Sequence, residues 1–396
     1  MTKKIYYEPA GRIHSNQWDL INYPPDGYDF VIDKPSKTEE IVTSDFFLFT
    51  SRRLLERLLP TNLTKTRIES IVKKIPQDID LIYAYNHPVF RKKPWVAFVE
   101  WAHVLIGRDI RHFARYKRLV ERLLTSNYCK GILTWTELAE KSIRLNFNCA
   151  DFEQKLEVIP QAVREKNFIK NYNKEEVRLL FVGSANVPQI FENKGGKEVL
   201  EVFSILNRKY NNLKLVIRAK IPQHIKDKYK MTLVMENVRL IEELLPWEVL
   251  QEEFMAADVF LYPTHELHNT VILDAMSYEL PVVTTEIGST GRLQDGVTGF
   301  IVGSSEKVSY FSENLIPIGA TPQRYLMTKA IQTVDDRVVS GLVEKVSLLI
   351  EKSELRKRMG KAARQEVEEG KFSIKNRNKK LKRVFDEATS SIPCKS

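Results

Sequence analysis

Short apolar runs of five to seven residues recur along this chain and alternate with amphipathic stretches. In chain order the runs are 3–7, 28–32, 80–85, 95–99 and 130–135, and, after a polar stretch over 164–176, they are 177–183, 213–218, 257–263 and 281–285. Runs of this length are typical of strands that are buried on both faces, and helices between them favour a parallel sheet. The pattern therefore predicts an α/β protein with two doubly wound parallel sheets, in which ligands bind at the carboxyl ends of the strands.

The length of the chain fits this division, because 396 residues exceed what one ordinary hydrophobic core organises. The polar stretch 164–176 is the expected linker between the two sheets. Residues 303–338 lack clear periodicity and are expected to form an insertion or a mobile segment. A basic helical pattern then runs from about 342 to 389.

Charge is distributed unevenly along the chain, whose net charge is +10. Residues 51–150 hold 19 Lys and Arg against 9 Asp and Glu, and the last 46 residues hold 14 against 7. Residues 251–300, in contrast, hold 1 against 8. The positive regions suit an anionic partner such as a membrane surface, a phospholipid or a nucleic acid.

The sequence favours a cytoplasmic protein. The N-terminal stretch MTKKIYYEPAGRIH lacks the apolar region of a signal peptide, and no run of about 18 apolar residues predicts a transmembrane helix. The three cysteines, Cys129, Cys149 and Cys394, cannot all pair and lack metal-ligand spacing. We therefore expect a reducing compartment and no structural zinc.

The stretch PTHELHNTVILDAMSYELPVVTT, residues 263–285, places two acids around a predicted helix start. Asn269 or Thr270 is the expected N-cap, and the free N–H groups of the first turn can bind an anion such as a diphosphate. Glu266 precedes that turn, and Asp274 lies one turn beyond Thr270 on the same face. The two carboxylates would accept hydrogen bonds from a sugar and from a ribose. From spacing alone, a solvated loop glutamate and a satisfied polar aspartate are equally good interpretations.

The wider stretch resembles the donor-binding half of family 4 glycosyltransferases. It reads A-D-V-F-L-Y-P-T-H-E-x7-D-A-M-S-Y-E-L-P-V-V-T-T-E-I-G-S-T-G-R-L-Q-D-G-V-T-G, where the family shows E-x7-E, A-M-x-x-G-x-P-V and D-G-x-T-G. The resemblance extends to V-R-L-L-F-V-G with K-G-G, to E-N-V-R-L and to K-L-E-V-I-P-Q-A-V. It is strong over about 160–302 and weak before that.

This resemblance implies the GT-B fold, with two Rossmann-like domains facing across a cleft. Residues 1–165 would bind the acceptor, residues 166–375 would bind the nucleotide-sugar donor, and residues 376–396 would form a crossover helix and tail that return to the first domain. The implied activity is retaining transfer of a sugar from a nucleotide-diphosphate sugar, UDP- or GDP-linked, to an acceptor hydroxyl. Neither a cofactor nor an obligatory metal is expected.

The resemblance also assigns donor-binding residues. Glu266 would contact the transferred sugar, Asp274 would hold the ribose although the family has Glu there, and Lys194 of K-G-G would neutralise the diphosphate. The Arg that commonly accompanies this Lys is absent, because Ser184 stands in its place, and Arg218 or Lys220 is the candidate substitute. The further donor-binding candidates are Asn269, Thr270 and Arg239. Glu279 stands where the family usually has Gly, so the preceding helix must end by another device.

Two weaker motifs lie in the first half. Gly11, in E-P-A-G-R, follows the first strand, where the family often has a Gly-rich turn that lets the backbone approach the donor. Glu100 and His103, in W-V-A-F-V-E-W-A-H, fall where the family often carries a catalytic His. The alternative is that Glu100 and His103 are interface residues whose hydrogen bonds are satisfied within the protein.

A basic amphipathic stretch spans residues 107–124. It places Ile110, Phe113, Val120 and Leu124 on one side and Arg108, Arg111, Arg115, Arg118 and Arg122 on the other. Together with R-R-L-L-E-R-L-L (52–59), it favours peripheral contact with anionic lipid at the inner face of the cell membrane. An ordinary domain helix with a solvated charged face is the alternative.

The expected function is therefore a hexosyltransferase-type enzyme of glycan, cell-envelope polysaccharide or glycolipid synthesis, with a glycan or lipid-linked acceptor. One alternative is a non-catalytic protein of the same shape that binds a glycan or a partner. A nucleic-acid-binding or DNA-modifying protein is a further alternative, but no nucleic-acid motif accompanies the basic residues.

Overall fold

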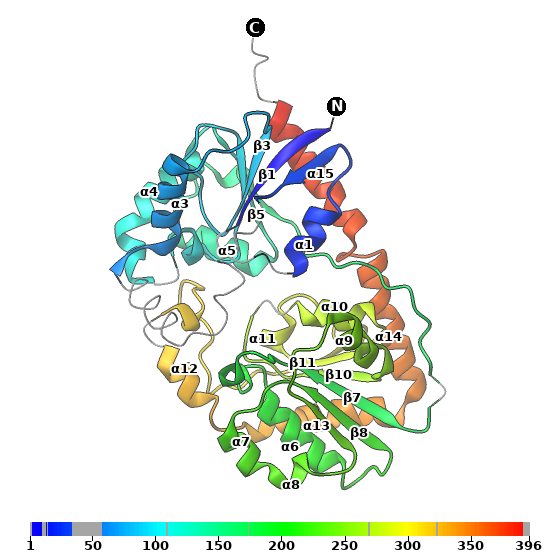
Figure 1. Cartoon of the computed structure of the whole chain (residues 1–396). Coiled ribbons are helices and arrows are strands. Elements are labelled where there is room, and N and C mark those ends of the chain that lie inside the picture. The colour runs from blue at the N-terminus through cyan, green and yellow to red at the C-terminus, as the bar shows by residue number, and fades with distance from the viewer. Residues whose placement is uncertain are drawn as a thin grey trace. The chain divides into compact units, whose positions relative to one another are not determined.

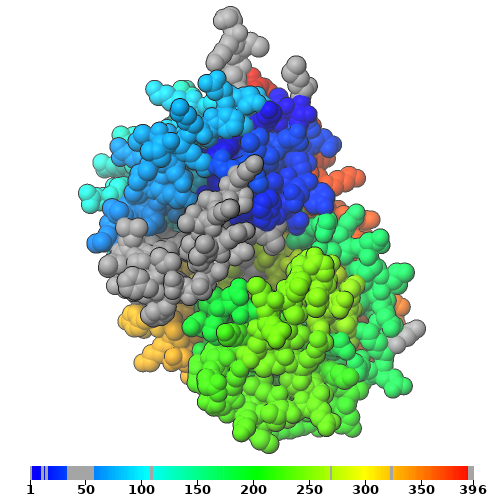
Figure 2. Space-filling view, in the orientation of Figure 1, coloured from blue at the N-terminus to red at the C-terminus, as the bar shows by residue number. Residues whose placement is uncertain are grey.

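The computed structural model describes most of the chain. The described residues are 2–9, 13, 15–33, 58–107, 110–172, 174–267, 270–321 and 324–390. Figure 2 draws residues outside these ranges in grey. The chain forms two compact units (Figure 1). Unit 1 comprises Met1–Gln161, Phe311–Arg324 and Ile374–Ser396, and unit 2 comprises Ala162–Tyr310 and Tyr325–Ser373.

Unit 1 is built on a six-stranded sheet with the order β2-β1-β3-β4-β5-β6, in which every pairing is parallel. The strands are β1 (Lys3–Pro9), β2 (Tyr28–Val31), β3 (Leu81–Tyr85), β4 (Trp95–Phe98), β5 (Cys129–Thr134) and β6 (Leu156–Val158). Ile5 and Leu81 belong to one apolar core, whereas the next residues, Tyr6 and Ile82, belong to another. Because successive side chains point to opposite faces of a sheet, both faces of this sheet are covered.

The helices of unit 1 are α1 (Ser15–Asn22), α3 (Thr61–Val72), α4 (Phe113–Thr125), α5 (Glu137–Asn146) and α15 (Ile374–Ser390). Helix α15 comes from the C-terminal end of the chain and buries Val384 and Phe385 in the same core as Tyr83 (Figure 1). The rings of Phe385 and Tyr28 meet at 5.3 Å, edge to face. The expected return of the C-terminal helix to the N-terminal domain is confirmed.

Part of the segment 303–338 also packs into unit 1. Phe311 lies against Trp101 with ring centroids 5.4 Å apart, and Ile316 is buried in the unit 1 core. The Asn146 amide donates to the carbonyl of Asn314 at 2.7 Å. The chain therefore leaves unit 2 after Tyr310 and contributes the segment that begins at Phe311 to unit 1. It re-enters unit 2 within α12 (Arg324–Ala330).

Unit 2 contains a second parallel sheet, with the order β12-β11-β10-β7-β8-β9. The strands are β7 (Val177–Val182), β8 (Leu213–Arg218), β9 (Val238–Ile241), β10 (Val259–Tyr262), β11 (Val282–Thr285) and β12 (Gly299–Val302). Val182 is paired with Arg218, and Tyr262 is paired with Thr284. Neighbouring strands therefore end level with one another, and the loops that follow them leave the sheet at one edge.

Helices again cover both faces of this sheet. They are α6 (Gly196–Leu206), α7 (Gln223–Lys228), α8 (Lys230–Leu233), α9 (Trp247–Ala256), α10 (Val271–Ser277), α11 (Glu286–Ser289), α13 (Asp336–Glu351) and α14 (Ser353–Glu368). The fold is thus α/β with two Rossmann-like parallel-sheet domains, which confirms the predicted fold class.

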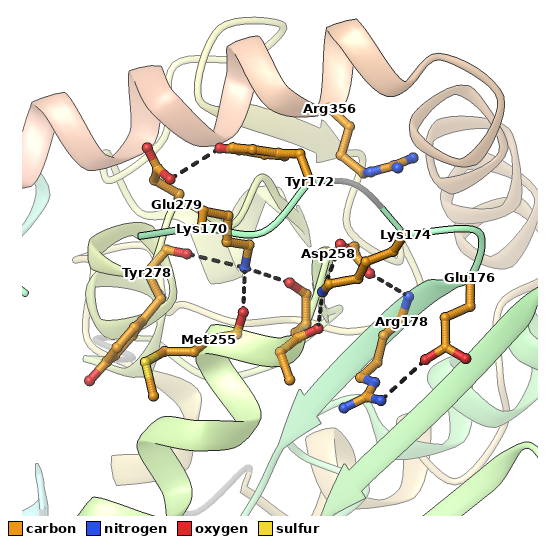
Figure 3. Close-up of polar contacts among 12 residues, drawn as sticks. Lys170, Tyr172, Lys174, Glu176, Arg178, Met255, Asp258, Tyr278, Glu279 and Arg356 are labelled. Atoms are coloured by element: carbon orange, nitrogen blue, oxygen red, sulfur yellow. Dashed lines mark hydrogen bonds and ion pairs between the residues drawn. The ribbon is translucent and has the colours of Figure 1, made fainter. Parts of the chain in front are cut away.

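The stretch predicted as a linker is part of unit 2 and packs against its helices (Figure 3). Lys170 is buried, and its ammonium donates to the carbonyls of Met255, Ala257 and Tyr278 at 3.1, 2.5 and 3.4 Å. These carbonyls lie at the ends of α9 and α10, where a cation is favourable because the last carbonyls of a helix lack backbone partners. Lys170 therefore caps two helices and fixes the path of the linker.

Helix α10 ends without the glycine that the family resemblance leads one to expect. Glu279 adopts φ +55°, in the left-handed region that favours glycine, and the Leu280 N–H donates to the Ala275 carbonyl at 3.2 Å. The Tyr172 hydroxyl donates to the Glu279 carboxylate at 3.1 Å. The helix therefore ends through a glutamate held in a glycine-type conformation by a linker tyrosine.

Candidate functional site

The carboxyl ends of the unit 2 strands gather most of the predicted donor-binding residues. Ser184 follows β7, Arg218 ends β8, and Glu266 lies in the loop after β10. Because β10, β7 and β8 are adjacent in the sheet, these loops leave the same edge side by side. This edge is where doubly wound sheets bind their ligands.

The loop before α6 and the loop after β10 are joined by hydrogen bonds. The carbonyl of Asn193 accepts from the His265 N–H at 2.8 Å and from the Thr264 hydroxyl at 3.2 Å. Gly195 has φ +82°, and a Cβ at this position would lie 2.2 Å from the carbonyl oxygen of Pro263. Only glycine permits this approach, so the K-G-G sequence determines where Lys194 lies.

Lys194 and Glu266 form an ion pair across these two loops. Nζ of Lys194 lies 2.5 Å from Oε2 of Glu266, and the Asn193 amide donates to the other carboxylate oxygen at 3.3 Å. Burial works to lower the pKa of Lys194, but Tyr262 and Glu266 beside it outweigh burial and raise that pKa. The structure thus brings together the two residues that the sequence assigned to the diphosphate and to the sugar.

Arg218 presents a guanidinium that pairs with no acid among the described residues. The residue is 8% exposed, its Nη1 donates to the Gly183 carbonyl at 3.1 Å, and its Nε has no hydrogen-bond partner among the described residues. Burial lowers its pKa. A buried cation without a counter-ion is costly, and such a position favours binding of an anion.

Ser184 shapes the turn after β7. Its hydroxyl accepts from the N–H groups of Asn186 and Val187 at 3.2 and 3.0 Å, and its carbonyl accepts from the Lys220 N–H at 2.8 Å. The side chain supplies no positive charge in place of the family's Arg. Arg218 ends the neighbouring strand, where it is paired with Val182, and it is a buried cation.

Asp274 lies on α10 rather than with the Lys194–Glu266 pair. It is partly buried in the first turn, and its N–H donates to the carbonyl of Thr270 at 3.2 Å. Burial and then the Asp274 carboxylate raise the pKa of Tyr278, while Arg164 opposes them. Thr270 occupies the N-cap position, but its side chain makes no capping hydrogen bond.

Of the three remaining predicted donor-binding residues, Arg239 alone belongs to the described part of the chain. Arg239 is in the edge strand β9 and pairs with Glu253 of α9, with Nη1 2.7 Å from Oε1. The structure therefore does not bring Arg239 to the end of the sheet. Asn269 and Gly11 fall outside the described residues.

The two candidate catalytic residues of the first half lie beyond the end of β4 in unit 1. Glu100 accepts from the Tyr85 hydroxyl at 2.6 Å, and its N–H donates to the Asn86 side chain at 2.9 Å. His103 is buried in a 3-10 turn (Ala102–Leu105), and its carbonyl accepts from the N–H groups of the residues that follow. Both residues thus lie at the carboxyl-terminal edge of their own sheet, with Glu100 partly exposed.

The basic amphipathic stretch forms α4. Val120 and Leu124 are buried in the core of unit 1, while Arg115, Arg118 and Arg122 are exposed. The apolar side of this helix is therefore used for packing, as expected of an ordinary domain helix, and the basic side faces solvent. The stretch 52–57 lies outside the described residues, and no described helix is long and apolar enough to cross a bilayer.

Several residues at the carboxyl-terminal edge of the unit 2 sheet were not predicted from the sequence. Asn193 binds Glu266, and His265 anchors the same loop. Arg292, after β11, is 4% exposed, and its Nε and Nη1 have no hydrogen-bond partner within the described part of the chain. Burial lowers the pKa of Arg292 to about 10. A lone Arg or His in a loop has no periodic pattern, so only the packed structure identifies these positions.

The sequence of unit 2 and the fold of the whole chain resemble known proteins. Residues 176–318 match the family described as Glycosyl transferases group 1. No curated protein sequence matches the chain. Sucrose-phosphate synthase from Thermosynechococcus elongatus is similar over 99% of this chain and 100% of its own, with a TM-score of 0.63 and 12% identity.

Two further solved structures are similar over the same shares, 99% of this chain and 100% of theirs. Alr3699/HepE from Anabaena, in complex with UDP and glucose, has a TM-score of 0.57 and 12% identity. A glycosyltransferase from Rickettsia africae ESF-5 has a TM-score of 0.58 and 10% identity. These structures show the fold, and together with the family match they support a GT-B glycosyltransferase.

Proposed function

We propose that this protein is a retaining glycosyltransferase that moves a sugar from a nucleotide-diphosphate sugar to an acceptor hydroxyl. Unit 2 binds the donor at the carboxyl ends of β7, β8 and β10. The proposal is supported by the family match over 176–318 and by the fold. The complex of Alr3699/HepE with UDP and glucose makes a UDP-sugar the first donor to test.

The observation that carries the proposal is the buried guanidinium of Arg218, which has no carboxylate partner in the described structure. A nucleotide diphosphate would supply the missing anion. Lys194 lies on the loop after the neighbouring strand β7, and its charge is shared with Glu266. Arg218 therefore takes the role of the absent family Arg, with Arg292 as a second buried cation on the β11 side.

Glu266 and Asp274 have separate roles in this proposal. Glu266 accepts hydrogen bonds from hydroxyl groups of the transferred sugar, and its carboxylate pairs with Lys194 beside the diphosphate. Asp274, on α10, holds the ribose. The first-turn N–H groups of α10, beginning at Thr270, face the same diphosphate.

The chemical step relies on electrostatic stabilisation. As the bond between the sugar and the diphosphate breaks, negative charge grows on the leaving diphosphate, and the fixed cations Lys194 and Arg218 stabilise it. In retaining transfer the acceptor attacks the face that the diphosphate leaves. No obligatory divalent metal is part of this proposal, so activity that EDTA abolishes and Mn²⁺ restores would contradict it.

The acceptor, the pathway and a membrane contact are also part of this proposal. The acceptor is a glycan or a lipid-linked glycan, in cell-envelope polysaccharide or glycolipid synthesis. The exposed arginines Arg115, Arg118 and Arg122 of α4 would hold the enzyme at an anionic membrane surface. Because the apolar side of α4 is buried, this contact is electrostatic and should weaken with salt.

A nucleotide panel tests the function. Melting temperature is measured with UDP, GDP, ADP and their glucose conjugates, and release of the nucleotide from each sugar conjugate is then followed. We expect one nucleotide series to raise the melting temperature, because a ligand that binds only the folded state stabilises it. Absence of any shift and of any release across the panel would contradict the proposal.

A further inference from the structure

His265, the residue before Glu266, is the centre of a buried polar cluster. It is 4% exposed, its Nε2 lies 3.2 Å from Oε1 of Glu198, and its Nδ1 lies 2.8 Å from the hydroxyl of Tyr310. The His265 and Tyr310 rings are nearly parallel, at an interplanar angle of 8°. Three separate segments of unit 2 thus meet at one imidazole.

The direction of these hydrogen bonds follows from the chemistry of the groups. With Nε2–H of His265 assigned as the donor to Oε1 of Glu198, Nδ1 accepts from the Tyr310 hydroxyl. Glu198 is 2% exposed and lies in the first turn of α6, where unpaired N–H groups favour a negative charge. That position explains how the acid is tolerated in the interior.

The cluster holds the backbone from which Glu266 projects. The His265 N–H donates to the Asn193 carbonyl at 2.8 Å, and the Glu266 N–H donates to the Thr264 hydroxyl at 3.0 Å. With the backbone and the ring of His265 both fixed, little freedom remains at the next residue. The backbone position from which the Glu266 side chain starts therefore depends on the contacts of His265.

Tyr310 brings a distant segment to this cluster. Residues 303–310 are themselves anchored, because the Ser304 hydroxyl accepts from the Ile287 N–H at 3.1 Å and the Ser305 hydroxyl donates to Asp335 at 2.7 Å. Tyr310 is the last residue of unit 2 before the chain enters unit 1. The hydroxyl that holds His265 is thus placed by an ordered segment.

We propose that Glu198, His265 and Tyr310 are positioning residues that direct Glu266 toward the sugar of the donor. Through them the structure sets how much the sugar contributes to donor affinity, while the nucleotide is bound elsewhere. The inference rests on the proposed function, because it needs a sugar nucleotide at Glu266. Burying an ionisable pair is costly and rarely stabilises a fold, and fixing a single geometry is what such a pair achieves.

The test uses the full chain and two nucleotides, UDP and UDP-glucose. Calorimetry measures the dissociation constant of each nucleotide. The sugar increment is the dissociation constant of UDP divided by that of UDP-glucose. Tyr310→Phe removes one hydroxyl and keeps the ring. We expect it to change the sugar increment by about 2- to 10-fold, the effect of one hydrogen bond, and to leave UDP affinity within about 2-fold. Glu198→Gln, which keeps the shape of the acid, should act in the same direction.

Tyr229→Phe is the matched control. The Tyr229 hydroxyl also donates to an acid of α6, Glu201, at 2.7 Å, whereas the hydroxyl of Tyr310 contacts His265. Its removal should leave the sugar increment unchanged. Equal changes in Tyr310→Phe and Tyr229→Phe would show a general effect of losing a buried hydroxyl and would overturn the inference.

A double variant separates positioning from an independent contact. If Tyr310 acts through Glu266, then Tyr310→Phe should change the sugar increment in the wild type but not in Glu266→Gln. Equal effects in both backgrounds overturn the inference. Wild-type binding of UDP-glucose with an unchanged increment in Tyr310→Phe overturns the inference alone. Absence of wild-type binding of both UDP and UDP-glucose overturns the proposed function and this inference with it.

Discussion

Nζ of Lys194 lies 2.5 Å from Oε2 of Glu266, so the cation assigned to the diphosphate and the acid assigned to the sugar are in direct contact. This contact joins two loops, one before α6 and one after β10. In the proposed complex, this pair of cation and anion lies between the diphosphate and the sugar of the donor. Each member of the pair can therefore be tested against a different part of that ligand.

Lys194→Gln tests the cationic half of the pair. The variant should bind UDP about 10- to 150-fold more weakly, because a hydrogen bond to a charged group contributes about 1.5–3 kcal/mol. Calorimetric titration with UDP measures the change. Lys209→Gln is the matched control, since Lys209 also pairs with a glutamate, Glu351, but is exposed. Equal affinity in both variants would contradict the role of Lys194.

Arg218→Met tests the buried guanidinium, which pairs with no acid in the described part of the chain, and opposite effects are expected on stability and on binding. Removing a buried charge that has no counter-ion should leave the free energy of unfolding unchanged or raise it by about 1 kcal/mol. UDP affinity should fall by about 10- to 150-fold. Urea unfolding without ligand and calorimetry with UDP measure the two effects. Lower stability with unchanged UDP affinity would show that Arg218 is structural.

The parallel sheets could be predicted from sequence because a buried strand is a short apolar run. The length and the period of such a run are enough to identify it as a strand. The nine runs correspond to nine of the strands, from β1 at Lys3–Pro9 to β11 at Val282–Thr285. The short strands β6, β9 and β12 were not among those runs. Strands of three or four residues in mixed sequence lack enough repeats to establish a period.

The site was predictable only in part, for reasons of geometry. The motif spacing identified Glu266 and Lys194, but their contact depends on the left-handed turn at Gly195. The partners of His265 are far apart in sequence, so no local pattern relates them. Arg239 has the residue type of a donor ligand, yet its position in β9 directs it to Glu253. Tertiary packing, rather than spacing, decides each of these cases.

Because Lys170 is buried, we expect the free energy of unfolding to depend on pH. Burial lowers its pKa to about 7, against 10.5 in the unfolded chain. Between these values the unfolded chain binds a proton that the folded chain does not, so stability rises with pH, by up to about 1.4 kcal/mol per pH unit. Below about pH 7 the folded and unfolded chains both bind this proton, so the contribution of Lys170 no longer changes with pH. Urea unfolding at pH 7 and pH 9 measures the slope.

Lys170→Met provides the comparison for this slope. The variant should be less stable at both pH values, since carbonyls at the ends of α9 and α10 lose their donor. Its stability should rise less between pH 7 and pH 9 than that of the wild type. The same rise in both proteins would assign the pH dependence to other groups.

Charge reversal on α4 tests the proposed membrane contact. Replacing Arg115, Arg118 and Arg122 with Glu should weaken binding to anionic vesicles, each removed positive charge contributing about 1 kcal/mol near the surface. Cosedimentation with phosphatidylserine vesicles at low salt measures the change, and neutral phosphatidylcholine vesicles are the control. Wild-type protein that ignores the anionic vesicles would contradict the contact.

The central claim is that unit 2 binds a nucleotide sugar with the ribose at Asp274 and the sugar at Glu266. Titration with free UDP tests it most directly, because UDP carries the ribose and the diphosphate but no sugar. Asp274→Asn should lower UDP affinity by about 10- to 150-fold, whereas Glu266→Gln should leave it nearly unchanged and mainly lower kcat with the sugar nucleotide. The reverse pattern, or unchanged UDP affinity in both folded variants, would contradict the assignment.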